Sequence, residues 1–163
     1  MKAFLKFAGL IAAVLALVAF ILMLASNALV TKALGNTYYV AGTSVLFGEK
    51  GAIVDVAPAA TAIIVFIFVI VAILILVLNF VMPLLKVKAF EKVGKILNFV
   101  AIGALVLAGI FLFFTRAAFS GANDGAFDDY NLAFGYVFAA ILLLLGGVVA
   151  FLPTAFALVG KKK

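Results

Sequence analysis

Residues 56–85 read VAPAATAIIVFIFVIVAILILVLNFVMPLL, a run of 30 residues without a charged side chain. A helix needs about 20 apolar residues to cross roughly 30 Å of hydrocarbon, so this run is long enough to span a membrane. Three further uncharged runs, 7–31, 96–115 and 130–160, are also long enough. The whole chain of 163 residues is 69% hydrophobic and 11% charged, which is too apolar for a soluble domain of this size. The sequence therefore predicts an integral membrane protein.

The four runs predict an all-α fold, a single domain over residues 1–163 built as one bundle of four transmembrane helices. The expected spans are about 4–27, 59–82, 96–115 and 131–158. The segments between them are outer loops at about 28–58 and 116–130 and a cytoplasmic loop at 83–95. The first span also resembles a secretory signal, but 18 apolar residues from Phe7 to Leu24 exceed the usual length of such a region, which favours an uncleaved helix.

The basic residues predict the orientation of the bundle. Nine of the twelve lie before the first span, between the second and third, or after the fourth. Basic loops stay in the cytoplasm, so both termini and the middle loop are expected on the cytoplasmic side. The expected location of the protein is the plasma membrane. The link from Pro83 to Lys95 is predicted to be a short amphipathic helix, whose lysines we expect to face anionic lipid: Lys86, Lys88, Lys92 and Lys95. A topology signal alone would give the same pattern.

The absent residue types narrow the chemistry. The chain has no His and no Cys, which removes thiolate metal sites, His-based catalysis and disulfides. We therefore expect no enzyme activity, no cofactor and no metal. An enzyme acting at the membrane surface, the remaining alternative, would have to use Asp124, Asp128, Asp129, Glu49 or Asp55 together with a lysine or Arg116. The positions of the charges explain the net charge of +6 without a nucleic-acid partner.

Small residues recur at helical spacing in three of the spans and predict faces where helices approach closely. The second span has large apolar side chains on every side of the helix and is expected to have the most lipid contact. The packing residues are Ala8, Ala12, Ala16, Gly103, Ala104, Ala108, Gly109, Gly146 and Ala150. Pro153 predicts a kink or an early end in the fourth span.

Two amides are the clearest polar side chains within the spans. Asn79 and Asn98 are expected at similar depth on antiparallel helices. An interhelical hydrogen bond between them is the favoured interpretation, and a solute ligand is the alternative.

The outer loops contain the remaining candidates. In the first loop, β-branched and aromatic runs at 37–40, 43–47 and 52–56 around the glycine-bounded turn 48–51 predict a small β-hairpin. Such a hairpin needs support, either as a lid on the bundle or from a partner. Its expected contact residues are Tyr38, Tyr39, Val45, Phe47 and Ile53. In the second loop, Asn123, Asp124, Asp128 and Asp129 resemble ordinary turn formers more than a cation site.

Four spans, both termini inside and a long first outer loop of β character make the chain similar in topology to claudins and other tetraspan membrane proteins. The resemblance implies a scaffold that assembles laterally and presents its outer loops to partners. Claudins carry a Trp-containing motif and a cysteine pair in that loop, whereas this chain has neither Trp nor Cys, so no functional residue is carried over.

These observations favour a non-enzymatic tetraspan scaffold or accessory subunit. Its expected partners are the lipid bilayer and either copies of itself in a homo-oligomer or a larger membrane complex. A pore or transporter for an uncharged or lipid-like solute is the alternative; apart from Lys6 near the start of the first span, the spans contain no charged group, which argues against ion coupling.

Overall fold

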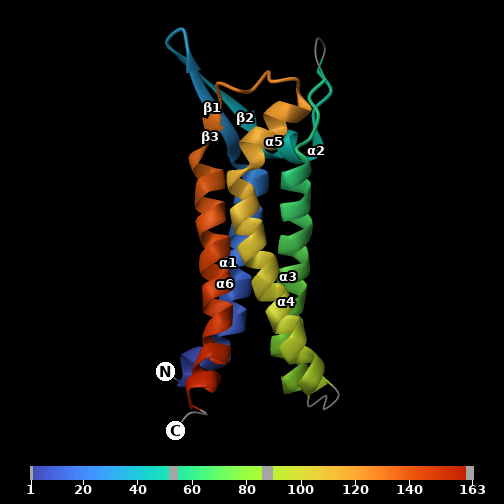
Figure 1. Ribbon diagram of the computed structural model, residues 1–163, viewed down its shortest axis with the longest axis vertical. Helices are drawn as coiled ribbons and strands as arrows, with labels where there is room; N and C mark the ends of the chain where they lie inside the picture. The colour runs from blue at the N-terminus through green and yellow to red at the C-terminus, as the bar shows by residue number, and fades with distance from the viewer. Residues whose placement is uncertain (1, 52–54, 86–89, 161–163) are drawn as a thin grey trace.

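Four long helices form the body of the molecule (Figure 1). The computed structural model describes residues 2–51, 55–85 and 90–160. The long helices are α1 (Lys2–Ala25), α3 (Ala60–Leu84), α4 (Phe90–Phe113) and α6 (Phe134–Gly160). All four are long and apolar enough to cross a membrane. The two termini lie at the same end of the bundle, together with the end of α3 and the start of α4 (Figure 1).

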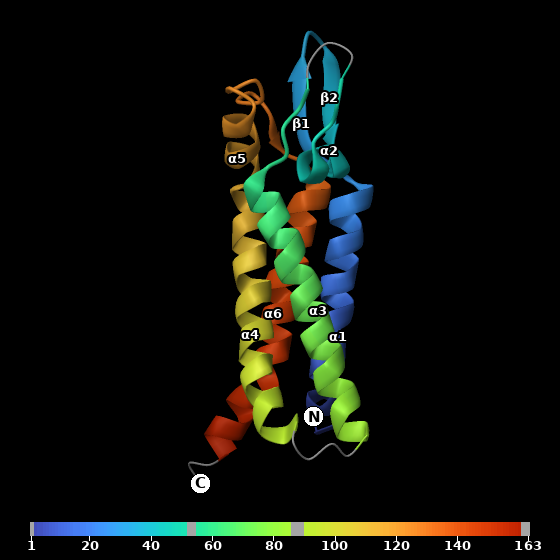
Figure 2. The ribbon, with the colours of Figure 1, turned by 90° about the vertical axis from the view of Figure 1, so that its right-hand side faces the viewer.

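The helix boundaries differ from the predicted spans at particular points. Span one was predicted to continue to residue 27, but α1 ends at Ala25 because Asn27 begins a strand. The segment 83–95 was predicted as a separate short helix, but its described residues mostly belong to the long helices, since α3 continues to Leu84 and α4 begins at Phe90. Pro153 does not end α6, which continues to Gly160, although its last turns are turned aside from the rest of the helix (Figure 2).

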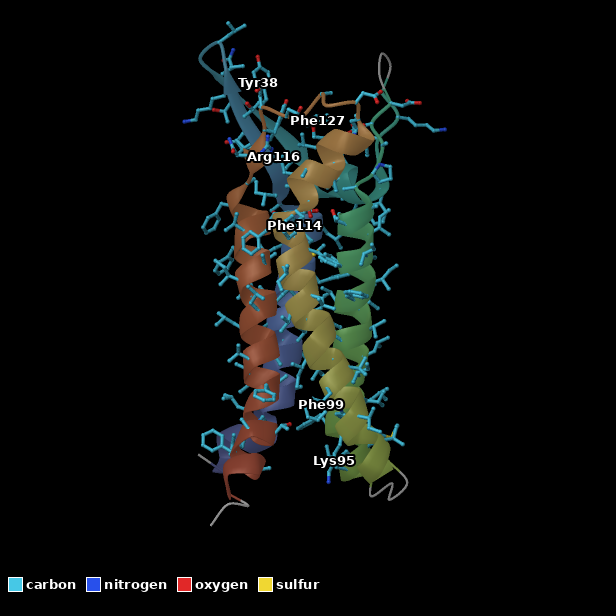
Figure 3. All side chains as sticks on the ribbon, in the orientation of Figure 1. Tyr38, Lys95, Phe99, Phe114, Arg116 and Phe127 are labelled. Atoms are coloured by element: carbon cyan, nitrogen blue, oxygen red, sulfur yellow. The ribbon has the colours of Figure 1, made fainter. Side chains whose placement is uncertain are left out.

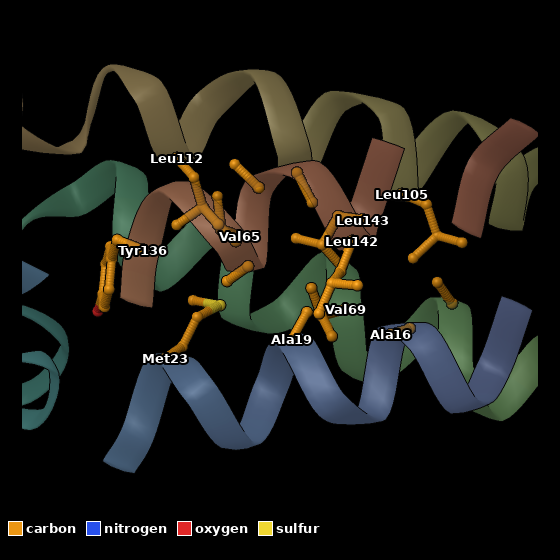
Figure 4. Close-up of a cluster of buried hydrophobic side chains, with 14 of the residues drawn as sticks. Ala16, Ala19, Met23, Val65, Val69, Leu105, Leu112, Tyr136, Leu142 and Leu143 are labelled. Carbon is orange, nitrogen blue, oxygen red and sulfur yellow. The ribbon is translucent and has the colours of Figure 1, made fainter. Parts of the chain in front are cut away.

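The core of the bundle is built from small and branched side chains at helical spacing (Figure 4). From α1 it takes Ala8, Ala12, Ala16, Ala19 and Met23. From α3 it takes Ala62, Val65, Val69, Ala72 and Leu76, spaced three and four residues apart, so α3 buries a stripe of its own. α3 also exposes large hydrophobic side chains along its length, such as Ile63, Ile67 and Leu74, so the expectation that this span has the most lipid contact stays a prediction.

A small cap covers the end of the bundle opposite the termini (Figures 1 and 2). Its sheet has the order β2-β1-β3 and is antiparallel. The cap elements are β1 (Asn27–Ala33), β2 (Asn36–Ala41), α2 (Gly42–Phe47), α5 (Thr115–Ala122) and β3 (Asn131–Leu132). The sheet joins the two outer loops, because β3 comes from the second loop and pairs with β1 from the first.

A hairpin is present in the first outer loop, but its predicted position was wrong. The turn is Leu34-Gly35, with φ of 52° and 80°, rather than the glycine-bounded segment 48–51. Both values lie in the left-handed region that two-residue hairpin turns require. The predicted strand 43–47 is helical, because α2 turns Val45 and Leu46 into the core. Of the predicted strand 52–56, only a single bridge between Glu49 and Val56 is described.

The second outer loop contains a helix that was predicted as loop. α5 follows α4 after a break at Phe114 and buries Thr115, Phe119 and Ser120. This buried face, together with three alanines, explains why the segment is helical. α5 leads from the end of α4 towards the sheet, so the rest of the second loop lies beside the strands (Figure 1).

Candidate functional site

The cap is tied together by hydrogen bonds between the two outer loops. The Asn123 side chain donates to the carbonyl oxygens of Ala57 (3.0 Å) and Phe119 (2.8 Å) and accepts from the Ala57 amide at 2.7 Å. The Thr31 hydroxyl donates to the carbonyl of Asp129 at 3.1 Å. Asn123 therefore fixes the end of α5 against the chain that leads into α3, and Thr31 fixes the hairpin against the second loop.

The acidic residues Asp124 and Asp128 shape the second loop itself. Asp128 accepts a hydrogen bond from the Ser120 hydroxyl at 2.5 Å, and its backbone carbonyl accepts one from the Arg116 guanidinium. Asp124 occupies a left-handed turn with φ of 53°. Within the described ranges, no group of three or more potential acidic, His or Cys ligands is close enough to hold a metal ion.

The hairpin of β1 and β2 extends beyond the rest of its sheet, away from the bundle (Figures 1 and 2). Leu34 at the turn is 98% exposed, and Tyr38 and Tyr39 on β2 are 46% and 59% exposed. Tyr38 lies at the end of the molecule opposite Lys95 (Figure 3). The hairpin therefore presents apolar and aromatic side chains well away from the helix core.

Leu34 combines two unfavourable features. A leucine in the left-handed region is strained, because its Cβ crowds the following carbonyl, and Asn, Asp or Gly is usual there. Its side chain also gains nothing from burial. Strain of this kind tends to be retained where it serves a function, which makes the tip a candidate contact site.

The other residues predicted for outer contacts fall in different places. Phe47 is exposed and its ring meets that of Phe66 edge-on at 5.8 Å, at the level where the cap meets the helices. Val45 was predicted to be available to a partner, but it lies on the buried face of α2. Ile53 lies outside the described residues. Close to Phe47, an open hollow of about 310 Å³ is lined by Gly48, Glu49, Lys50, Asp55, Val56, Ala57 and Pro58.

Most of the small residues predicted for packing lie between helices of this same chain. Ala8, Ala12, Ala16, Ala108 and Ala150 are buried. A Cβ added to Gly146 would lie 3.5 Å from the Ala12 carbonyl, so α6 and α1 approach closely there.

The small residues of α4 fall into two classes. A Cβ on Gly109 would lie 2.8 Å from Leu144 and 3.0 Å from the Ala140 carbonyl, both on α6. Gly103 has open space where a Cβ would be, and Ala104 is only partly buried. Gly109 therefore packs closely against α6, whereas Gly103 does not.

The predicted hydrogen bond between the two amides is not formed. Asn98 instead donates to the carbonyl of Ala150 on α6 at 3.4 Å. The Asn79 side-chain nitrogen is buried and has no partner among the described residues. Similar depth along antiparallel helices is not sufficient for a hydrogen bond, because each side chain must also point towards the other helix.

The lysines predicted to face anionic lipid are only partly described. Lys95 is exposed near the start of α4. Lys92 lies in α4, but its side chain is outside the described part of the structure, as are Lys86 and Lys88 entirely.

Sequence reasoning missed Leu34 and the role of Asn123. Leu34 carries no signal of its own, and only the following Gly35 points to a turn. Asn123 was grouped with the acidic turn formers, whereas its three hydrogen bonds come from contacts that no local pattern reveals.

No protein-family model matches the chain, and comparison with curated proteins gives no significant match.

Proposed function

We propose that this chain is a non-enzymatic membrane protein of the plasma membrane that acts as a scaffold or accessory subunit through its outer hairpin. Both termini are placed in the cytoplasm in this proposal, and the cap faces the outside. The observation that carries it is the hairpin tip, where an exposed and strained Leu34 projects together with Tyr38 and Tyr39.

The distribution of charge supports the orientation. In the sequence, nine basic residues and one acidic residue, Glu91, lie before the core of the first span, between the second and third spans, or after the fourth. The capped end carries three basic and five acidic residues. The positive-inside rule assigns the first of these groups to the cytoplasm.

The packing of the bundle favours a contact surface on the cap rather than on the helices. Most of the small-residue faces are used between helices of the same chain, and the core is filled by apolar side chains. A filled core favours a scaffold over a pore through a single copy. The hairpin, by contrast, leaves large apolar side chains in water, which is typical of a surface that meets a partner.

The test is site-specific photo-crosslinking in native membranes of cells that make the full chain. A photoreactive benzophenone side chain is placed at Leu34 or Tyr39, and at Ala122 on α5 as an exposed control in the cap. We expect discrete adducts from the hairpin positions and none from Ala122. No adduct from the hairpin, or equal adducts from all three positions, would overturn the proposal.

The orientation is tested separately, since the chain has no cysteine of its own. In intact cells, a membrane-impermeant maleimide should label Tyr38→Cys and should label Lys95→Cys only after lysis. The reverse pattern would refute the assignment of the two ends.

A further inference from the structure

The outer edge of β2 is an unprotected sheet edge. β1 pairs with one side of β2, and no described strand pairs with the other. Residues 36–41 read NTYYVA, with no charge and no proline, and all but Val40 are exposed. Soluble sheets usually protect such an edge with lysine, proline or a covering element. This edge is therefore suited to pair with another strand.

The register shows which backbone groups point outward. Ala33 and Asn36 flank the two-residue turn, and Thr31 pairs with Tyr38 two residues further on. Hydrogen-bonded and non-hydrogen-bonded pairs alternate along an antiparallel ladder. The backbone N–H and C=O groups of Thr37 and Tyr39 therefore lie on the free edge, on either side of Tyr38.

We propose, on the basis of the outer-contact function above, that this edge pairs antiparallel with β2 of a second copy of the chain. An antiparallel edge is its own complement under a two-fold axis perpendicular to the sheet. Thr37 and Tyr39 of one copy then meet β2 of the other, near an axis that lies between the two strands, level with the centre of β2. An uncharged strand meets no like-charge repulsion when it faces itself.

The direction of the strands decides how the two copies are placed. β1 and β2 extend roughly along the long axis of the bundle (Figures 1 and 2). A two-fold axis perpendicular to the sheet then lies parallel to the membrane plane. The second copy is inverted, and its bundle lies in an opposing membrane.

Pairing between neighbours in one membrane is sterically poor. If two copies had the same orientation, β2 of one copy would have to pair with the opposite edge of the other copy's sheet. At that edge, β3 already covers Leu29 and Val30 of β1. Three strands at a spacing of about 4.8 Å are roughly 14 Å wide. Two packed helices of about 10 Å each are wider, so the bundles would collide before the sheets met.

A single β2 pair is too small for a stable complex. Six residues per copy contribute far less than the roughly 1,200 Å² that specific interfaces bury, so binding has to come from many pairs between two membranes. We therefore expect monomers in dilute detergent and a steep dependence on protein density in vesicles.

The experiment uses two populations of phosphatidylcholine vesicles that carry the full chain and different fluorophores. Vesicle clustering is measured as the two labels coming together, in lipid without anionic headgroups that would bind the lysines. Thr37→Lys and Tyr39→Pro should reduce clustering at least about tenfold, because lysine protects an edge and proline removes an outward N–H. Ala122→Lys adds the same charge away from the edge and should cluster normally. Clustering retained in both edge variants would overturn the proposal.

Single cysteines at positions 37, 38 and 39 distinguish the arrangement of the copies. Mixed-label disulfide dimers between the two populations, at one or more of these positions but not with Ala122→Cys, are the expected result. Dimers found only within one population would overturn the opposed arrangement. If the Leu34 photo-adducts above contain only other proteins and no mixed-label dimer forms, this inference fails while the scaffold function stands. An absence of any hairpin adduct would refute the scaffold function itself.

Discussion

Gly109 and Gly103 give a matched test of how closely α4 packs against α6. Each is changed to alanine on the same helix, so the gain of about 1 kcal/mol in helix propensity is common to both and cancels in the comparison. At Gly103 the new methyl group meets nothing within 4 Å. At Gly109 it meets Leu144 at 2.8 Å and the backbone oxygen of Ala140 at 3.0 Å, and this oxygen cannot move without moving α6. Overpacking of this kind typically reduces stability by about 1–3 kcal/mol.

The free energy of unfolding should therefore be about 1–3 kcal/mol lower for Gly109→Ala than for Gly103→Ala. It can be measured by titration with a denaturing detergent in mixed micelles, followed by far-ultraviolet circular dichroism. Gly146→Ala, whose methyl group would sit at an ordinary 3.5 Å from its neighbours, should be at least as stable as Gly103→Ala. Equal stability of Gly109→Ala and Gly103→Ala, or the reverse order, would refute the packing of α4 on α6 described above.

Three further predictions concern single side chains. Asn123→Ala should lower stability by about 1–3 kcal/mol, because it leaves backbone groups of Ala57 and Phe119 without partners; unchanged thermal unfolding and proteolysis of the cap would contradict this. Asn79→Leu should leave stability unchanged or raise it, because it removes a buried amide nitrogen without a partner. Asn98→Leu should lower stability by about 0.6 kcal/mol, because it removes the hydrogen bond to Ala150. The opposite order of the two variants in the same titration would refute both assignments. Leu34→Gly should stabilise the hairpin by about 1 kcal/mol by relieving the left-handed leucine while removing the contact side chain, so a lower melting temperature would show that Leu34 is not strained.

The helices could be predicted from the sequence because charge is excluded from long segments that lie in lipid. This constraint needs no knowledge of neighbouring helices, and it places the four spans within six residues of the ends of α1, α3, α4 and α6. It gives no information on rotation about the helix axis. For this reason the pairing of Asn79 with Asn98 was wrong.

The cap was harder to predict because its elements depend on contacts between the two loops. Glycines at 48 and 51 are a stronger turn signal than Leu34-Gly35, so the hairpin was placed too late in the chain. α2 and α5 are short helices that are helical because one face is buried, as Leu46 and Phe119 show. Nothing in the local spacing of the first loop shows that β1 also pairs with Asn131.

The junctions between sheet and helices have a mechanical consequence. Only Ser26 separates α1 from β1, and only Ala133 separates β3 from α6. A hydrogen bond of 2.8 Å from the Ala133 amide to the Ala28 carbonyl joins the two junctions, and Gly135 packs against Ser26. The hairpin is thus attached to two adjacent helices through short, hydrogen-bonded junctions, so it should move with them. A small tilt of α1 against α6, produced by a change in bilayer thickness, would displace the hairpin tip and could be followed there with a single spectroscopic label.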